Sequence, residues 1–217
     1  MNSLNPIFMS IVCGVLGYFI GSIPFGWIIV KLVKGVDLRT VGSGRTGGTN
    51  AYRAAGFVPG LVTALLDVFK GALTVLIVRN LVGTSTLGWA EALAGLGVVL
   101  GHNHSLFLGF KGGAGGATAV GTGMAFWLTG GLPAFVIGVG ILFVLGYAFM
   151  ATIAAALTVA IVFTVGAFSG QVPWAYVVFG WGIVVLCTLT LRPNIKRFLA
   201  GEEKRVQLLK RKSASKA

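Results

Sequence analysis

Long apolar runs separated by short polar stretches dominate the chain. The first apolar run extends from Pro6 to Val30, and another begins at Ala54 after a polar interval. Between Gly112 and Leu191 the chain has no Asp, Glu, Lys, Arg or His. Because about 20 apolar residues suffice to cross a bilayer as a helix, the pattern predicts an all-α polytopic integral membrane protein.

The breaks between the apolar runs predict about seven membrane-spanning helices, some of them short. The first polar loop, the stretch Gly101–Gly116 and the segment after Leu191 are all expected on the cytoplasmic side. The expected spans are Pro6–Val30, Val58–Asn80, Leu87–Leu100, Ala117–Thr129 and three more before Arg192, with an outer loop at Gly83–Ser85 and later breaks at Gly130–Pro133, Gly146–Thr152 and Ser169–Pro173. Short helices beside Gly101–Gly116 indicate that this loop lines a cavity open to the cytoplasm.

Composition and charge agree with a membrane protein. The 217 residues have a mean hydropathy of +0.92 and only 10% are charged, against about 25% in a soluble domain. Lys and Arg outnumber Asp and Glu by 17 to 5, and nine of the 17 lie between Arg192 and Lys216. The positive-inside rule explains this excess, so we expect membrane lipids rather than nucleic acid as partners. The amino terminus is expected outside and the carboxyl terminus in the cytoplasm.

The predicted organisation is one membrane domain, residues 1–200, and a basic, partly disordered tail, residues 201–217. A cleaved signal peptide is not expected, because Pro6–Val30 is too long for its apolar region. Cys13 and Cys187 fall inside predicted spans, and we expect buried free thiols rather than a disulfide. His102 and His104 lack the carboxylates of a metal site. We therefore expect no metal or other cofactor, and we expect a monomer.

The first polar island is VGSGRTGGTN, Val41–Asn50, followed by AYRAAG. Glycines allow successive backbone amides to converge on an anion, and hydroxyl and guanidinium groups suit phosphate. The candidate ligands here are Gly42, Ser43, Gly44, Arg45, Thr49, Asn50 and Arg53. The alternative is a flexible turn between helices with positive-inside charge.

The second island is GHNHSLFLGFKGGAGGATAVG, Gly101–Gly121, which repeats the theme of glycines, a cation and a helix start. The amino terminus of a helix directs its dipole at an anion. The candidates are His102, Lys111, Gly112, Gly113, Gly115 and Thr118. The alternatives are a turn with a glycine-packed helix, and structural histidines.

Two further islands are LRPNIKRFLAGEEKRVQ and LLDVFKG. In the first, Asn194 stands at the membrane edge among basic residues; the alternative is an ordinary basic helix beside the membrane. In the second, Asp67 and Lys70 are spaced i,i+3 and can pair on one helical face. We interpret them as a self-neutralised pair that braces the loops. No set of residues typical of a covalent nucleophile is evident in the sequence.

Together these motifs resemble the bacterial acyl-phosphate:glycerol-3-phosphate acyltransferase family of the PlsY type, over about Tyr18 to Glu203. GSGRTGGTNAYRAAG, GHNHSLFLGFKGGAGGATAVG and LRPNIKRFLAGEE are similar to its three cytoplasmic motifs in order, and SIPFGWII and LLDVFKG also match. The resemblance implies transfer of a fatty acyl group from acyl-phosphate to the sn-1 hydroxyl of glycerol-3-phosphate in the bacterial inner membrane, without a metal, coenzyme A or acyl carrier protein.

The resemblance also implies roles for individual residues. Ser43, Thr49, Arg53 and Asn194 take the catalytic positions, the glycines Gly112, Gly113 and Gly115 hold glycerol-3-phosphate, and Thr152 is the nearest counterpart of a paired-serine site.

The chain departs from the family pattern at four positions. Arg45 replaces an asparagine, Ala114 a lysine, Leu191 a histidine and Pro193 a glutamate. We hypothesise that Arg45 supplies the charge missing at Ala114. Rival interpretations are a weakened paralogue that binds acyl-phosphate or lipid, and a transporter of a phosphorylated solute.

Overall fold

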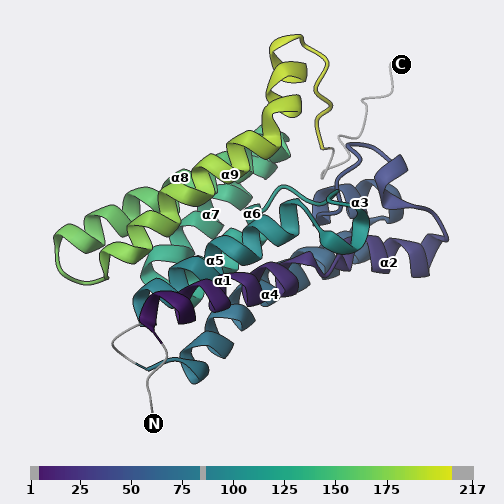
Figure 1. Ribbon diagram of the computed structural model, residues 1–217. Helices are drawn as coiled ribbons and strands as arrows, with labels where there is room; N and C mark the ends of the chain where they lie inside the picture. The colour runs from purple at the N-terminus through teal and green to yellow at the C-terminus, as the bar shows by residue number, and fades with distance from the viewer. Residues whose placement is uncertain (1–4, 84–86, 207–217) are drawn as a thin grey trace, which may run out of the picture.

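The computed structural model describes residues 5–83 and 87–206, and all regular secondary structure there is helical, without strands (Figure 1). The last part of the predicted basic tail, residues 207–217, lies outside the described residues, as do residues 84–86, of which 84 and 85 belong to the predicted outer loop. The helices are α1 Pro6–Ser22, α2 Phe25–Lys34, α3 Gly48–Ala55, α4 Phe57–Leu81, α5 Leu87–Asn103, α6 Gly116–Phe126, α7 Leu128–Leu145, α8 Ala148–Phe168 and α9 Trp174–Leu199, with 3₁₀ turns η1 Leu38–Thr40 and η2 Leu106–Leu108.

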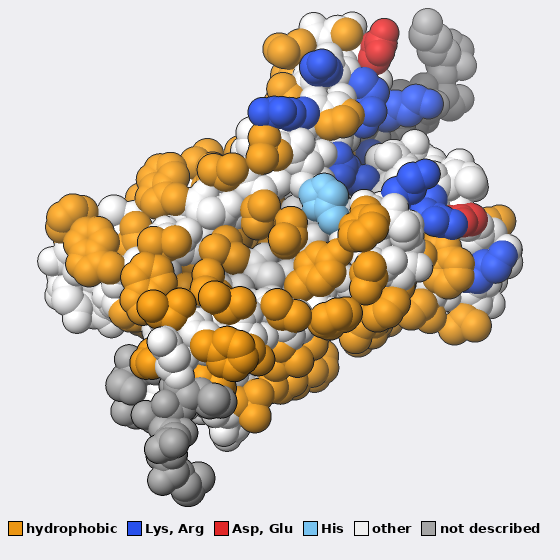
Figure 2. Space-filling view, in the orientation of Figure 1, with side chains coloured by type: hydrophobic (Ala, Val, Ile, Leu, Met, Phe, Trp, Pro, Cys, Tyr) orange, Lys and Arg blue, Asp and Glu red, His pale blue; other side chains and the backbone are white. Residues whose placement is uncertain are grey.

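The long helices run between two ends of the molecule. The start of α1 and the α8–α9 loop lie at one end, and α2, α3 and the last turns of α9 lie at the other (Figure 1). Lys and Arg side chains gather at this second end, whereas hydrophobic side chains cover most of the rest of the visible face (Figure 2). Five segments of the described chain are long and apolar enough to cross a membrane: Pro6–Lys34, Phe57–Leu81, Leu128–Leu145, Ala148–Phe168 and Trp174–Leu199. The polytopic all-α prediction is confirmed, and the count of seven spans stays a prediction.

Several predicted boundaries differ from the structure. The first apolar run is interrupted at Ile23 and Pro24, so α2 is a separate helix. The predicted break at Gly130–Pro133 is wrong, because the chain turns at Trp127 and these residues lie inside α7. Gly131 allows the tight α6–α7 turn, since a Cβ there would lie 2.2 Å from the Met124 nitrogen. The third polar island continues α9 as helix through Pro193 to Leu199.

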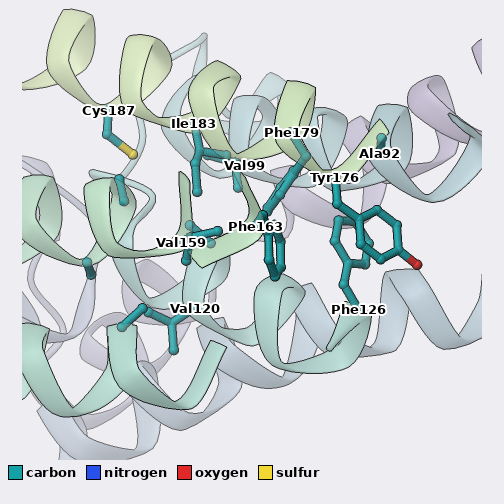
Figure 3. Packing of buried hydrophobic residues seen from close by; sticks show 14 of the residues in the cluster. Ala92, Val99, Val120, Phe126, Val159, Phe163, Tyr176, Phe179, Ile183 and Cys187 are labelled. Carbon is teal, nitrogen blue, oxygen red and sulfur yellow. The ribbon is translucent and has the colours of Figure 1, made fainter. Parts of the chain in front are cut away.

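A hydrophobic core of small and aromatic residues joins α5, α6, α8 and α9 (Figure 3). The ring of Phe126 stacks on Tyr176 with centroids 4.3 Å apart and meets Phe179 edge-on at 4.8 Å. Cys13 and Cys187 are both buried free thiols, as predicted. Elsewhere, close backbone contact replaces side-chain packing: a Cβ at Gly21 of α1 would lie 2.1 Å from the Val98 carbonyl oxygen of α5.

An ion pair lies at the same end of the bundle as the α8–α9 loop. Arg79, near the end of α4, pairs with Glu91, whose side chain is 1% exposed. The Tyr176 hydroxyl donates to the same carboxylate. Arg79 also donates to the Phe126 carbonyl at 3.2 Å, and so satisfies the end of the short helix α6.

Candidate functional site

The first polar loop is shaped by one buried side chain. The Asn50 amide nitrogen donates to the carbonyl oxygens of Val41 at 2.9 Å and Arg45 at 2.8 Å, and its oxygen accepts from the Ser43 amide at 3.0 Å. Gly42 and Gly44 have φ of +56° and +71°, a conformation that glycine adopts readily. Because its amide is occupied by the loop, Asn50 positions Ser43 and Arg45.

The second loop is built against His102. A Cβ at Gly112 would lie 2.2 Å from the His102 carbonyl oxygen, and a Cβ at Gly113 would lie 1.9 Å from His102 Nε2. The Gly113 amide donates to the same carbonyl at 2.9 Å. The Thr46 amide donates to the Gly112 carbonyl at 3.3 Å and joins the two loops. These glycines therefore shape the loop through close backbone packing.

Arg45 connects the first polar loop with the second island and with the island that contains Asn194. Its guanidinium donates to the Asn194 side-chain oxygen through Nε at 3.2 Å and Nη2 at 3.0 Å, and to the Gly113 carbonyl at 3.2 Å. It also donates to the Thr190 carbonyl. Burial lowers the pKa of Arg45, and the neighbouring Glu203 carboxylate acts in the opposite direction. An arginine stays protonated at neutral pH, so Arg45 is a fixed cation where the loops meet.

A cavity of about 230 Å³ lies at this junction. Its polar part includes Ser43, Thr49 and Arg53, while α7 and α8 contribute an apolar part that includes Phe135, Gly138, Leu142 and Ala155. Burial also lowers the pKa of Arg53, which again stays cationic. The same cavity thus has a polar part that contains cations and an apolar part formed by α7 and α8.

Three helices begin at the cavity wall. Gly48 starts α3, Gly116 starts α6 and Ala148 starts α8, and all three residues line the cavity. Their first turns leave backbone N–H groups without helical partners and carry the positive ends of the helix dipoles. Gly116 lets α6 approach α8 closely, since a Cβ there would lie 2.7 Å from the Thr152 hydroxyl oxygen. This arrangement favours anions.

The predicted pair of Asp67 and Lys70 is confirmed, with 3.0 Å between Nζ and Oδ1. Both side chains are 2% exposed. His102 Nδ1 lies 3.4 Å from the same carboxylate oxygen. Sequence reasoning missed that Asp67 lines the cavity beside His102. The i,i+3 spacing indicated the ion pair but not the tertiary contact.

The segment after α9 folds back onto the cavity. Glu203 lines it, accepts from Asn194 Nδ2 at 2.8 Å and pairs with Arg197 Nε at 2.8 Å. Arg53 donates to the Lys204 carbonyl at 3.1 Å, and the Val206 amide donates to the Gly146 carbonyl at 2.7 Å. No pattern in the sequence indicates that this segment folds back, because residues 202–206 have no regular secondary structure.

The structure brings together most of the predicted site residues. Those that line the cavity are Ser43, Arg45, Thr49, Asn50, Arg53, His102, Gly115, Thr152 and Asn194. Gly42, Gly44, Gly112 and Gly113 shape the adjoining loops instead. Lys111 is exposed and does not line the cavity, and Thr118 is buried in the first turn of α6. Among residues 5–83 and 87–206, no three His, Cys, Asp or Glu side chains gather in a way that could hold a metal ion.

Comparison with known proteins gives consistent matches over most of the chain. The family model described as Glycerol-3-phosphate acyltransferase matches residues 11–201. The glycerol-3-phosphate acyltransferase of Trichormus variabilis is 36% identical over 211 residues, covering 89% of this chain and 92% of the relative. That of Aquifex aeolicus is 38% identical over 191 residues, covering 88% and 96%.

Two solved structures of PlsY (YgiH), an integral membrane glycerol 3-phosphate acyltransferase, share the architecture. The glycerol 3-phosphate form has a TM-score of 0.79 at 36% identity and covers 90% of this chain and 94% of that one. The lysophosphatidic acid form has a TM-score of 0.77 at 35% identity, with the same coverage.

Proposed function

This chain belongs to the glycerol-3-phosphate acyltransferase family and is an integral membrane enzyme that acylates glycerol-3-phosphate in phospholipid synthesis; we propose that its acyl donor is an acyl-phosphate and that the sn-1 hydroxyl is the acceptor. The products are then 1-acyl-glycerol-3-phosphate and inorganic phosphate. We further propose that the cavity opens to the cytoplasm and that the enzyme resides in the bacterial inner membrane.

One observation carries the proposal: three helix amino termini and two arginines converge on a cavity that continues into an apolar groove between α7 and α8. Both substrates are anions and one carries a fatty chain, so an acyl-phosphate fits with its head among the cations and its chain in the groove. The groove residues Ala134 to Leu142 of α7 extend over about 12 Å, at 1.5 Å per residue.

The proposed reaction depends on bringing the two substrates together and neutralising their charges more than on a nucleophilic side chain. Two phosphates repel each other, and preorganised amides and guanidinium groups offset this repulsion while they hold the hydroxyl near the acyl carbonyl. We assign phosphate binding to Ser43 of the first polar loop, to Thr49 in the first turn of α3 and to Arg53 in its last turn. The loop Gly112–Gly115 holds glycerol-3-phosphate. Asn194 acts through Arg45, because its amide lies between Arg45 and Glu203.

The test supplies purified protein in detergent with acyl-phosphate and glycerol-3-phosphate and measures lysophosphatidate and phosphate together. We expect equimolar release of both products, and no lysophosphatidate when acyl-coenzyme A replaces acyl-phosphate. Arg53→Ala should abolish most of the activity. Lys34→Ala is the control, because Lys34 is an exposed cation at the end of α2 and does not line the cavity.

The outcomes also separate the rival interpretations. Phosphate release without lysophosphatidate would identify a hydrolase, and binding of acyl-phosphate without turnover would identify a weakened paralogue. Flux of glycerol-3-phosphate into liposomes without acylation would identify a transporter.

A further inference from the structure

Asp67 carries a buried oxygen that has no hydrogen-bond partner among the described residues. Its side chain is 2% exposed and lines the cavity from α4. The oxygen Oδ1 is taken by Lys70 at 3.0 Å and faces His102 at 3.4 Å. The second oxygen, Oδ2, is buried and accepts no hydrogen bond from the described residues.

An unpaired buried acceptor is uncommon and unfavourable. At least nine in ten buried polar atoms in proteins have a hydrogen-bond partner, and leaving one unpaired is destabilising, more so for a charged group. A carboxylate oxygen accepts but cannot donate, so its missing partner is a donor. A hydroxyl group of a bound molecule meets this requirement.

The surroundings of Asp67 make it compatible with an anionic ligand. Lys70 balances its charge and is itself fixed, since Nζ also donates to the carbonyl oxygens of Gly21 and Ile23 at 3.0 Å each. These carbonyls lie where α1 ends, so the pair is anchored to the α1–α2 junction. With the charge of Asp67 neutralised, its free oxygen can accept a hydroxyl close to the cations that hold a phosphate.

We propose that Asp67 Oδ2 accepts a hydrogen bond from the secondary hydroxyl of glycerol-3-phosphate and so selects a phosphate ester with two neighbouring hydroxyls. This inference rests on the proposed function. Asp67 belongs to the wall formed by α4, whereas the apolar groove belongs to α7 and α8. A hydroxyl held by Asp67 is therefore set apart from the acyl chain, and the primary hydroxyl remains available to the acyl carbonyl. His102 and Lys70 fix the carboxylate and act as positioning residues.

The experiment compares glycerol-3-phosphate with 1,3-propanediol monophosphate, which keeps the phosphate and a primary hydroxyl but lacks the secondary hydroxyl. The measured quantity is the ratio of kcat/KM for the two acceptors. A hydrogen bond to a charged group corresponds to a ratio of roughly 10 to 150 in the wild type. In Asp67→Asn the amide oxygen must face the Lys70 ammonium, so the NH2 donor replaces Oδ2. We therefore expect the ratio to fall below about 3, although both rates fall.

Controls separate recognition from a purely structural role. Thr74→Val alters a buried residue of the same helix whose hydroxyl donates to the Lys70 carbonyl at 2.8 Å, and it should keep the wild-type ratio. If Asp67→Asn does not fold, the double variant Asp67→Leu with Lys70→Met removes the whole ion pair, a replacement that proteins often tolerate. Its ratio should also fall below about 3.

Two results would overturn the inference: a wild-type ratio near 1, or an unchanged ratio in a folded variant that lacks the Asp67 carboxylate. Failure of the proposed function looks different, because the wild type would then acylate neither acceptor.

Discussion

Replacement of Arg45 with alanine removes a cation from the centre of the site. In the structure Arg45 donates two hydrogen bonds to Asn194 and one to the Gly113 carbonyl, which immediately precedes Ala114. The guanidinium therefore lies beside Ala114, the position at which the family pattern has a lysine. This placement agrees with the hypothesis that Arg45 supplies the missing charge, which stays a prediction until activity is measured.

The expected magnitude follows from the contact that is lost. A hydrogen bond from a charged donor contributes about 1.5–3 kcal/mol, so loss of one phosphate contact lowers kcat/KM about 10- to 150-fold. Adding Ala114→Lys to Arg45→Ala should restore kcat/KM to within about threefold of wild type, because the new ammonium enters the same space. The assay is lysophosphatidate formation in detergent at a fixed acyl-phosphate concentration.

Two comparisons make the result interpretable. Lys34→Ala should stay within about twofold of wild type, since Lys34 is exposed and surface substitutions away from special features change free energies by only about 0.5 kcal/mol. Thermal unfolding of each variant shows whether the loops remain assembled. If Arg45→Ala retains wild-type kcat/KM, the reasoning is refuted. If it is impaired but Ala114→Lys restores nothing, Arg45 acts as a scaffold that joins the three loops and not as the substitute charge.

Three further substitutions test other parts of the structure. Gly113→Ala should raise the KM for glycerol-3-phosphate about tenfold, because a methyl group would lie 1.9 Å from His102 Nε2 and distort the loop; an unchanged KM would contradict this packing argument. Gly138→Leu should shift preference towards shorter acyl-phosphates by obstructing the groove between α7 and α8, as measured by competition between chain lengths; an unaltered preference would remove Gly138 from the acyl site. Glu91→Gln should lower thermal stability by about 1–3 kcal/mol, because Arg79 loses its charged partner, while KM stays unchanged; an altered KM would show coupling between the two ends of the bundle.

The sequence alone determined the class of fold, because hydropathy depends on local composition. An apolar run of sufficient length must satisfy its backbone internally in lipid, and a helix does so without distant partners. The same local logic located the polar islands and the i,i+3 pair of Asp67 and Lys70, which the structure confirms at 3.0 Å. Local composition did not locate the α6–α7 turn: the glycines near Pro133 mark close packing, and the chain turns at Trp127.

The tertiary structure decided which polar groups meet. Arg45 and Asn194 are separated by 149 positions in the chain, yet they share a hydrogen bond because α9 returns to the end where the first loop lies. The same folding excludes Lys111 from the cavity, brings Asp67 to its wall and places Glu203 across it. Such contacts depend on how the helices pack and where the loops fold back. The distances between these side chains are therefore set by the assembled bundle rather than by spacing along the chain.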